Sequence, residues 1–414
     1  QAEDGIRDLV RSRGLGDVYK RQAFRGFLKR IGESDAVSFA PSLSIPLWCG
    51  GRRHLLRSSP LPGPLHLLPS LLHDLPLTWS QRLSAMRAGA ALWSASPGTL
   101  ADVTFDVWLS HHRQDAQTRA VLWHPVVIAT LNAPASRVSA AAAQKVFLDG
   151  VLQRRGAGLG FFQRPLSRIS ASAVSYIEAH GGTASLRSAV HKIVVQQGQV
   201  RGLRLTTGEF LEADTIISAV PPKDLASLLP RTAAMEVALP AQQALKGSPI
   251  VNVHLWLDRP VLDEVLWIAA DAPIQTAFDV TRLRPPSGTA RYHHLAISQS
   301  AASEWLKSSD AQIVDRCLHA LAPLAPRVAS AHLVHARVIR HPQATFIPAP
   351  GVDRHRPRPV CGIRGLYLAG DWTATGWPST LEGAVRSGIL AAGRATASSS
   401  EMADGVDVTP MLYG

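Results

Sequence analysis

The chain has 414 residues, a formal net charge of +12, 46% hydrophobic residues and 18% charged residues. This length favours two or three domains, and the composition excludes a disordered polypeptide. The three cysteines, Cys49, Cys317 and Cys361, lie too far apart for a metal motif or a disulfide framework, which favours a reducing compartment. The positive charge would suit an anionic surface, but no basic run is interleaved with aromatic residues, so we predict no nucleic-acid binding.

Residues 1–22 differ in character from the rest of the chain. They contain no initiator Met and no apolar signal-peptide region. We expect a non-native or disordered leader here, with the natural chain resuming near Ala23. The chain also lacks a glycine-rich GxGxxG loop between a strand and a helix, because neither Gly14–Gly16 nor Gly156–Gly160 has the required spacing.

The segment 23–174 is predicted to be mostly helical, with proline-rich joints. In the predicted helix 80–93, Leu83, Met86 and Ala90 share one face. The apolar stretch Ser58–His73 is interrupted by prolines and is interpreted as a surface loop over the core, with a lipid-facing lip or a tunnel wall as the alternatives. No uncharged stretch reaches the ~20 residues that a membrane span needs. Further helices are expected from Phe105, over 120–131 with a kink at Pro125, and over 135–151.

The rest of the chain alternates strands and helices, which predicts a mixed sheet with flanking helices. The pattern of Ser248–Asp258 predicts a half-buried strand with Val251, Val253, Leu255 and Leu257 on one face. The remaining predicted elements are a helix ending at His180, strands at 190–196, 214–220, 292–298 and 332–340, a hairpin around Thr207-Gly208 and a helix over 311–322.

Residues 365–388 form the most informative segment. An apolar strand, Leu366–Ala369, runs into Gly370, where the backbone can turn freely. Asp371 then follows the carboxyl end of the strand, where α/β sheets bind ligands. Pro378, Ser379 and Thr380 are suited to start a helix. The positive end of that helix would attract an anion or an electron-rich ring.

This segment resembles the C-terminal flavin signature of the FAD-dependent amine oxidase and phytoene desaturase superfamily. The resemblance implies FAD as the cofactor, with Asp371 bound to its ribityl–pyrophosphate part and the helix from Ser379–Thr380 directed at the isoalloxazine ring. Gly370, Trp372 and Pro378 complete this part of the implied site. Trp372 and Trp377 could wall the ring or belong to the core. In the second FAD-binding segment, the resemblance places Val190, Ala219 and Pro221 near the adenine end.

The fold implied by the resemblance is α/β (α+β). It comprises a split Rossmann-like FAD-binding domain without its first βαβ unit, and a substrate domain of mixed sheet and helices. The expected boundaries are a leader at 1–22, substrate-domain segments at 23–174 and 236–345, FAD-domain segments at 175–235 and 346–395, and a loose polar tail at 396–414.

One branch of the superfamily is similar over a larger part of the chain. Stretches 58–72, 122–140, 341–357 and 366–388 resemble hydroxysqualene dehydroxylases. This resemblance implies reductive conversion of hydroxysqualene to squalene in bacterial hopanoid synthesis, a polyisoprenoid lipid substrate, and a place in the bacterial cytoplasm, with or without peripheral contact at the inner membrane. A phytoene-type carotenoid desaturase and an inert fragment unable to hold FAD are the alternatives.

Loss of a hydroxyl group requires a general acid. The spacing does not choose a catalytic residue, and we expect a structural role for each candidate before a catalytic one. His111 and His112 are adjacent on a predicted helix and cannot both face one ion, so no metal site is predicted. The candidate acids are Asp102, Asp106, His111, His112 and His124.

Overall fold

The computed structural model describes residues 22–152, 159–285 and 291–404. By its internal contacts the chain divides into two units. Within the described residues, unit 1 comprises 28–152, 159–173, 247–285 and 291–350, and unit 2 comprises 22–27, 174–246 and 351–404. The leader expected at 1–22 lies outside the described residues except for Gln22, which begins helix α2 (Gln22–Arg30).

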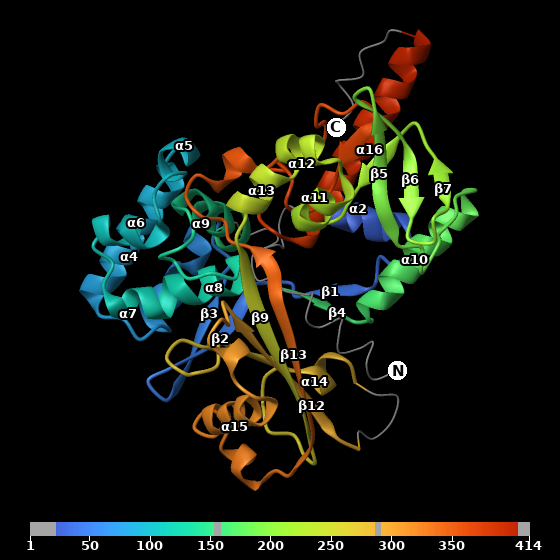
Figure 1. Ribbon diagram of the computed structural model, residues 1–414. Coiled ribbons are helices and arrows are strands. Elements are labelled where there is room, and N and C mark those ends of the chain that lie inside the picture. The colour runs from blue at the N-terminus through green and yellow to red at the C-terminus, as the bar shows by residue number, and fades with distance from the viewer. Residues whose placement is uncertain (1–21, 153–158, 286–290, 405–414) are drawn as a thin grey trace. The chain divides into compact units, whose positions relative to one another are not determined.

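Unit 1 is built on a seven-stranded sheet with the order β13-β9-β12-β11-β10-β2-β3. Its neighbouring strands are antiparallel, apart from the parallel pair β2 and β10. The two longest strands, β9 and β13, run side by side (Figure 1). This mixed sheet confirms the predicted α/β class. The strands are β2 (Ser44–Cys49), β3 (Arg52–Arg57), β9 (Gly247–Leu257), β10 (Leu266–Ala269), β11 (Thr276–Asp279), β12 (His293–Ser300) and β13 (Leu333–Phe346).

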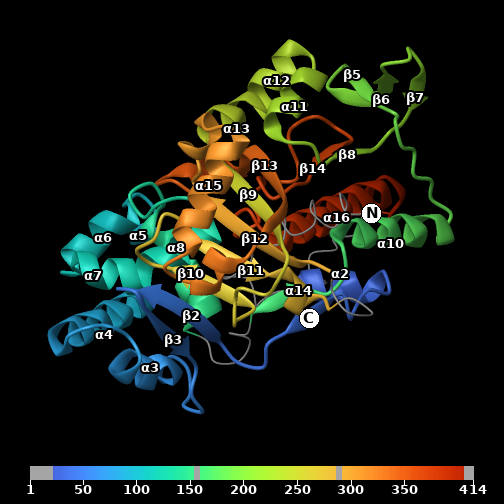
Figure 2. The same ribbon diagram turned by 90° about the horizontal axis from the view of Figure 1, so that it is seen from below.

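For unit 1 one expectation was incomplete and one was wrong. The segment predicted to be mostly helical contains the β2–β3 hairpin and a second pair, β1 (Val37–Phe39) with β4 (Gly160–Phe162). Gly50 and Gly51 form the hairpin turn at φ +60° and +70°, the conformation that two-residue hairpin loops require. Strand β9 is buried on both faces rather than half-buried. Its valine and leucine face packs with helix α15 (Asp310–Leu321), as Figure 2 shows, and its polar face is also covered.

The helices of unit 1 surround a second core centred on Phe105, whose ring contacts Trp108, Trp123 and Phe147. The helix predicted from residue 135 begins only at Ala140, because Ser139 caps it by accepting the Ala142 N–H. The helices are α3 (Leu68–His73), α4 (Trp79–Ser94), α5 (Pro97–Leu100), α6 (Phe105–His111), α7 (Ala116–Thr118), α8 (His124–Leu131), α9 (Ala140–Val146), α10 (Leu166–Ala179), α14 (Val280–Leu283) and α15. Short 3-10 or π turns cover Leu65–Leu67, Arg119–Trp123, Phe147–Val151, Trp305–Lys307 and Pro326–Ser330.

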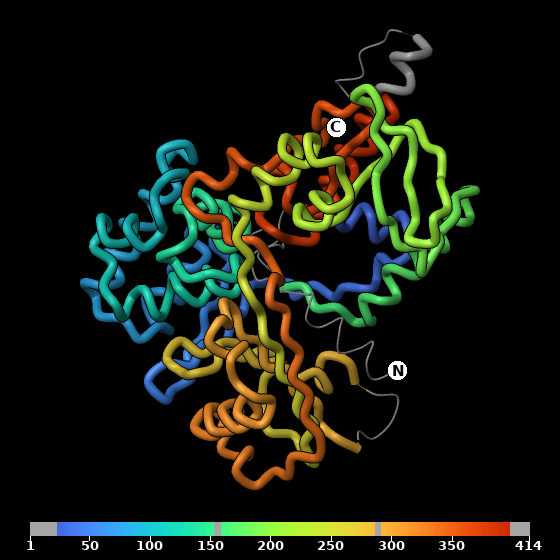
Figure 3. Tube along the Cα trace, in the orientation of Figure 1, coloured from blue at the N-terminus to red at the C-terminus, as the bar shows by residue number. Residues whose placement is uncertain are grey.

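Unit 2 contains two small sheets. In Figure 3 its segments can be followed by colour, from green and yellow (174–246) to red (351–397). One sheet is a parallel pair, β8 (Ile216–Ser218) and β14 (Leu366–Leu368), and the other is an antiparallel meander of β5 (Val190–Gln196), β6 (Gln199–Leu205) and β7 (Phe210–Glu212). The helices are α11 (Pro222–Leu228), α12 (Arg231–Val237), α13 (Leu239–Ala244), the 3-10 turn η6 (Val352–His355) and α16 (Leu381–Asp404).

Helix α16 corrects one further expectation. The loose tail predicted from Thr396 is helical as far as Asp404, the last residue described at this end. None of the helices in the described part of the chain is long and apolar enough to cross a bilayer.

A buried carboxylate joins α10 to the loop after α2 within unit 1. The Glu33 side chain is only 3% exposed and accepts hydrogen bonds from Ser172 Oγ at 2.8 Å, Arg168 Nε at 3.0 Å and Arg164 Nη1 at 3.0 Å. The Ser172 hydrogen bond, followed by those of the two arginines, lowers the pKa of Glu33 despite its burial. Asp35 also pairs with Arg164, but its side chain is 68% exposed.

We therefore expect Glu33→Gln to lower the free energy of unfolding by about 2 kcal/mol, because the buried partners lose a charged acceptor. Asp35→Asn is the matched control and should cost less than about 1 kcal/mol. Urea unfolding measures both. The folded pKa of Glu33 lies below its unfolded value, so its stabilisation is complete above the unfolded pKa and disappears as the pH falls through the folded pKa. Equal losses in the two variants, or a Glu33→Gln effect that does not shrink in acid, would contradict this role.

Candidate functional site

The strand ends of β8 and β14 meet at one edge of their parallel sheet. Leu368 lies opposite Ser218, and the Ala369 N–H donates to the Ser218 carbonyl at 2.8 Å. Directly afterwards Gly370 takes φ +121°, and a Cβ at this position would stand 2.5 Å from Trp372 Nε1. Only glycine fits this turn, which sets the direction of the loop that carries Asp371.

The start of α16 is fixed to the same turn. The buried Ser387 hydroxyl accepts the Gly370 N–H at 2.7 Å and donates to the Ala384 carbonyl at 2.6 Å. Thr380 caps the helix, because its Oγ1 accepts the Gly383 N–H at 3.1 Å. Helix α16 therefore begins beside the end of β14.

Asp371 and the helix start form the polar centre of the candidate site. The half-buried Asp371 carboxylate accepts a hydrogen bond from the Ser379 hydroxyl. In the described part of the chain, the N–H groups of Leu381 and Glu382, in the first turn of α16, have no hydrogen-bond partner. A carboxylate acceptor beside unfilled donors at a positive helix end suits a ligand with both hydroxyl groups and electron-rich oxygens. FAD is such a ligand, so these residues fit it.

The buried Arg356 guanidinium organises the loop that follows Asp371. It donates to the Asp371 carbonyl at 2.9 Å and the Trp372 carbonyl at 3.4 Å, and it pairs with Asp353 at 3.0 Å. Sequence reasoning missed this residue, although it lies within the 341–357 stretch. The signal for Arg356 in the sequence was Asp353, which lies three residues before it.

Both tryptophans of the signature are buried. Trp372 Nε1 donates to the Val220 carbonyl at 3.1 Å, which joins the turn after β8 to this loop. The Arg386 guanidinium lies 5.1 Å from the centre of the Trp377 ring. Burial and these contacts give both side chains a place in the core of unit 2.

Two of the three predicted adenine-end residues share one turn, between β8 and α11. Ala219 and Pro221 are exposed and flank Val220, so the Trp372 contact brings their turn to the Asp371 loop. Val190 is the half-buried first residue of β5 and pairs with Leu205. Among the described residues, no hydrogen bond connects Val190 with the loop from Gly370 to Thr380.

Glu382 is a second buried residue that the sequence did not single out. Its carboxylate accepts the Phe24 N–H at 2.9 Å and the Ala23 N–H at 3.4 Å, and it pairs with Arg386 at 2.6 Å. It thereby caps α2 from α16 with a negative charge at the positive helix end.

Of the five candidate acids, the structure brings two together. Asp106 pairs with Arg119 at 2.7 Å and lies 3.8 Å from His124 Nε2. Burial lowers the pKa of His124 and also that of His112, whose ring packs on Trp108. Asp102 lies in the turn before α6, and His111 is the last residue of that helix.

A buried histidine pair on the sheet of unit 1 was also missed. His254 Nδ1 lies 2.9 Å from His294 Nε2, and the His294 ring stacks on Trp256 with centroids 4.5 Å apart. Burial lowers the pKa of His254 to about 4 and that of His294 to about 3. Both rings are therefore neutral at pH 7. The signal for this pair in the sequence was His254, a histidine on the polar side of β9 between core valines and leucines.

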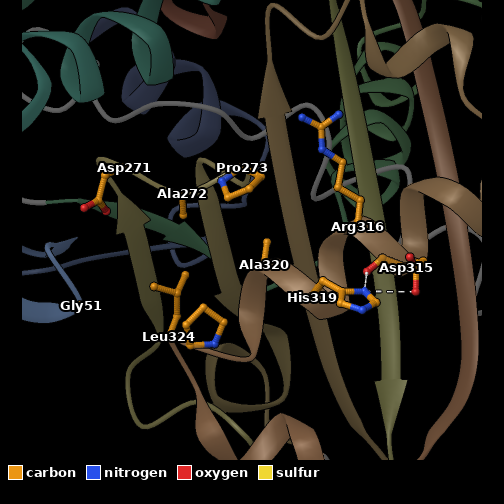
Figure 4. Close-up of a pocket in the computed structure, with 10 residues that line it drawn as sticks. Gly51, Asp271, Ala272, Pro273, Asp315, Arg316, His319, Ala320 and Leu324 are labelled. Carbon is orange, nitrogen blue, oxygen red and sulfur yellow. Dashed lines mark hydrogen bonds and ion pairs between the residues drawn. The ribbon is translucent and has the colours of Figure 1, made fainter.

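A separate depression in unit 1 has a volume of about 490 Å³ (Figure 4). The turn after β10 contributes Asp271 and Pro273, and α15 contributes Arg316 and His319. His319 pairs with Asp315 at 3.1 Å, and Arg316 lies over the Trp305 ring. The residues that line this depression include none of the predicted site residues. No group of three His, Cys, Asp or Glu side chains able to hold a metal occurs among the described residues.

Comparison with known proteins decides the family. The model of the flavin containing amine oxidoreductases matches residues 24–396. The chain belongs to this family. Its curated relatives include the tomato (Solanum lycopersicum) 15-cis-phytoene desaturase, 28% identical over 249 residues that cover 58% of this chain and 43% of that protein. A hydroxysqualene dehydroxylase from Rhodopseudomonas palustris is 32% identical over 188 residues, covering 44% of this chain and 40% of that protein. The matches thus span about half or less of these relatives.

Solved structures agree on the fold. An oxidoreductase from Methanosarcina mazei superposes with a TM-score of 0.68 at 17% identity, covering 91% of this chain and 85% of that one. Cyclohexylamine oxidase from Brevibacterium oxydans gives 0.62 at 17% identity, with coverages of 92% and 87%. The predictions of a flavin-family oxidoreductase and of FAD as the cofactor are confirmed at the level of the family.

Gly370→Ala tests whether the turn after β14 requires a residue without a Cβ. We expect a loss of more than about 2 kcal/mol in the free energy of unfolding, because a Cβ there is strained and collides with the Trp372 indole. Gly376→Ala is the matched control, since Gly376 has φ +70° with open space around it, and should cost about 1 kcal/mol. Urea unfolding and near-UV circular dichroism report both effects. Equal losses and an unchanged tryptophan signal would contradict the constraint.

Proposed function

We propose that the protein is an FAD-dependent oxidoreductase acting on a polyisoprenoid lipid, and that its reaction is the reductive dehydroxylation of hydroxysqualene to squalene. The observation that carries the flavin assignment is the Asp371 carboxylate beside the unfilled N–H groups of Leu381 and Glu382, in a chain of a flavin family. The substrate class rests on relatives named for hydroxysqualene and phytoene, both polyisoprenoids.

In this proposal each residue has a defined task. Asp371 accepts hydrogen bonds from cofactor hydroxyls, and the N–H groups at the start of α16 donate to cofactor oxygens. Gly370, Trp372, Pro378, Ser379 and Thr380 shape that loop, and Val190, Ala219 and Pro221 serve the adenine end. Bound FAD supplies hydride transfer.

The proposed reaction consumes one hydride and one proton. The C–O bond breaks, a C–H bond forms, and the hydroxyl group leaves as water, so a proton donor must reach its oxygen. The cluster of Asp106 and His124 is the pair of candidate acids that the fold brings together. A lipid substrate also fits a protein of the bacterial cytoplasm with peripheral contact at the inner membrane.

Asp371→Asn should lower FAD occupancy of the purified protein by about tenfold, because a neutral amide is a weaker acceptor for hydroxyl donors. Asp224→Asn changes an exposed aspartate of unit 2 outside the site and should leave occupancy unchanged. Flavin absorbance relative to protein absorbance measures both after gel filtration. Equal occupancy in wild type and Asp371→Asn would contradict the assigned role.

The reaction is tested with two substrates. With FAD and a chemical reductant, the protein should convert hydroxysqualene to squalene, as measured by gas chromatography, and should not desaturate phytoene in the presence of a quinone. A phytoene-type desaturase is the second candidate, favoured by the longer alignments to phytoene desaturases. Desaturation of phytoene alone would establish that candidate. A protein that holds no flavin and turns over neither substrate would contradict both.

A further inference from the structure

Helix α4 of unit 1 is apolar on the side that faces away from the core. Its buried side chains are small or medium, namely Ala85, Ala88 and Leu92. Its large side chains are exposed instead: Trp79 by 67%, Leu83 by 45% and Trp93 by 45%. An ordinary surface helix has the opposite arrangement, with large apolar residues inside and polar residues outside.

The exposed apolar residues and the half-buried Met86 form one stripe. At 100° per residue, Trp79, Leu83, Met86, Ala90 and Trp93 fall within an arc of about 80°, opposite the buried alanines. We call these five residues the α4 stripe. Its two tryptophans lie about 21 Å apart along the helix axis. A straight rod with an indole at each end can place both rings at one depth in a flat surface.

Basic side chains flank the α4 stripe. On the same helical projection Arg82 lies on one side of it and Arg87 on the other, and the Arg82 guanidinium is 5.1 Å from the Trp79 ring centre. Residues 41–101 contain five arginines and a single acidic residue, Asp74. Arg57 pairs with Asp74 and Arg53 with Glu264, and the Asp115 carboxylate accepts a hydrogen bond from Gln81 of α4.

The neighbouring segment adds exposed apolar groups. Leu61 and Leu65 are exposed in the proline-rich stretch before α3, the stretch that the sequence left open between a surface loop and a lipid-facing lip. Helix α3 packs against α4, and Arg82 Nη2 donates to the Leu75 carbonyl between them at 3.1 Å. Figure 2 shows α3 and α4 next to each other within unit 1.

We propose that the α4 stripe docks on the surface of an anionic lipid bilayer, with α4 lying in the plane of the interface. Tryptophans at both ends, leucine and methionine between them, and arginines on the flanks are the features of a helix that lies in a membrane interface. The arginines decide between occupants. They attract anionic head groups, whereas a second copy of the same stripe would bring like charges together. The proposal concerns unit 1 and does not depend on the reaction.

Vesicle binding tests the proposal with the full chain. Wild-type protein should co-sediment with phosphatidylcholine vesicles containing phosphatidylglycerol, and bind more weakly to pure phosphatidylcholine. The double variant Trp79→Ser/Trp93→Ser should bind about tenfold or more weakly, because two interfacial indoles are lost. Leu186→Ser, which removes a leucine that is 86% exposed in unit 2, is the matched control and should bind like wild type.

A second measurement does not rely on a variant with reduced vesicle binding. With Cys361→Ser in both proteins, an environment-sensitive dye on A90C should shift to the blue on addition of the anionic vesicles, and the same dye on L186C should not. An unchanged dye spectrum at position 90, or equal vesicle binding by wild type and the double variant, would overturn the proposal. So would a dimer in solution that the double variant converts to monomer without any vesicle binding by wild type, because the α4 stripe would then be a self-interface.

Discussion

The hydrogen bond from the Gly370 N–H to the buried Ser387 hydroxyl is the interaction on which the candidate site depends. It ties the second residue after β14 to the second turn of α16, although the two lie 17 positions apart in sequence. With both ends held, the intervening loop has a fixed start and a fixed finish. Arg356 holds its first half through two carbonyl groups, and Thr380 caps its end. Asp371 thus lies beside the helix start because of several small polar contacts.

Both units combine apolar cores with buried polar groups. Unit 1 has two large apolar clusters, one among its helices and one between α15 and the long strands. Unit 2 also buries apolar side chains, among them Leu225, Trp372 and Trp377, and it has an apolar cluster of Tyr367, Ala369, Ala391 and Ala395. Its buried polar groups include Arg356, Glu382 and Ser387, all with hydrogen-bond partners. Such groups specify geometry strongly because each is costly to leave unpaired.

Helix α4 carries mainly small apolar side chains on its buried side and large ones on its exposed side. The pattern of Leu83, Met86 and Ala90 was identified correctly as one face of a helix, yet the structure turns that face away from the core. The sequence period indicates that a helix has an apolar side but not which way that side faces. Helix α4 has two apolar sides, one buried and one exposed. The alanines at 85 and 88 fill the narrow space against the core, which leaves the larger side chains to another environment.

The sequence by itself determined the elements whose cause is local. These are the strand and glycine of the flavin signature, the capping residues before α16, the hairpin around Thr207-Gly208 and the four longest helices, α4, α10, α15 and α16. It missed the β2–β3 hairpin, the full burial of β9 and the partners of Glu33, Arg356 and His254, because each depends on residues far away in the chain. Tertiary structure alone decided that Asp371 meets Ser379 and that the indole of Trp372 reaches the turn after β8. The physical reason is that hydrogen bonding and burial depend on neighbours in space, and no periodicity encodes these.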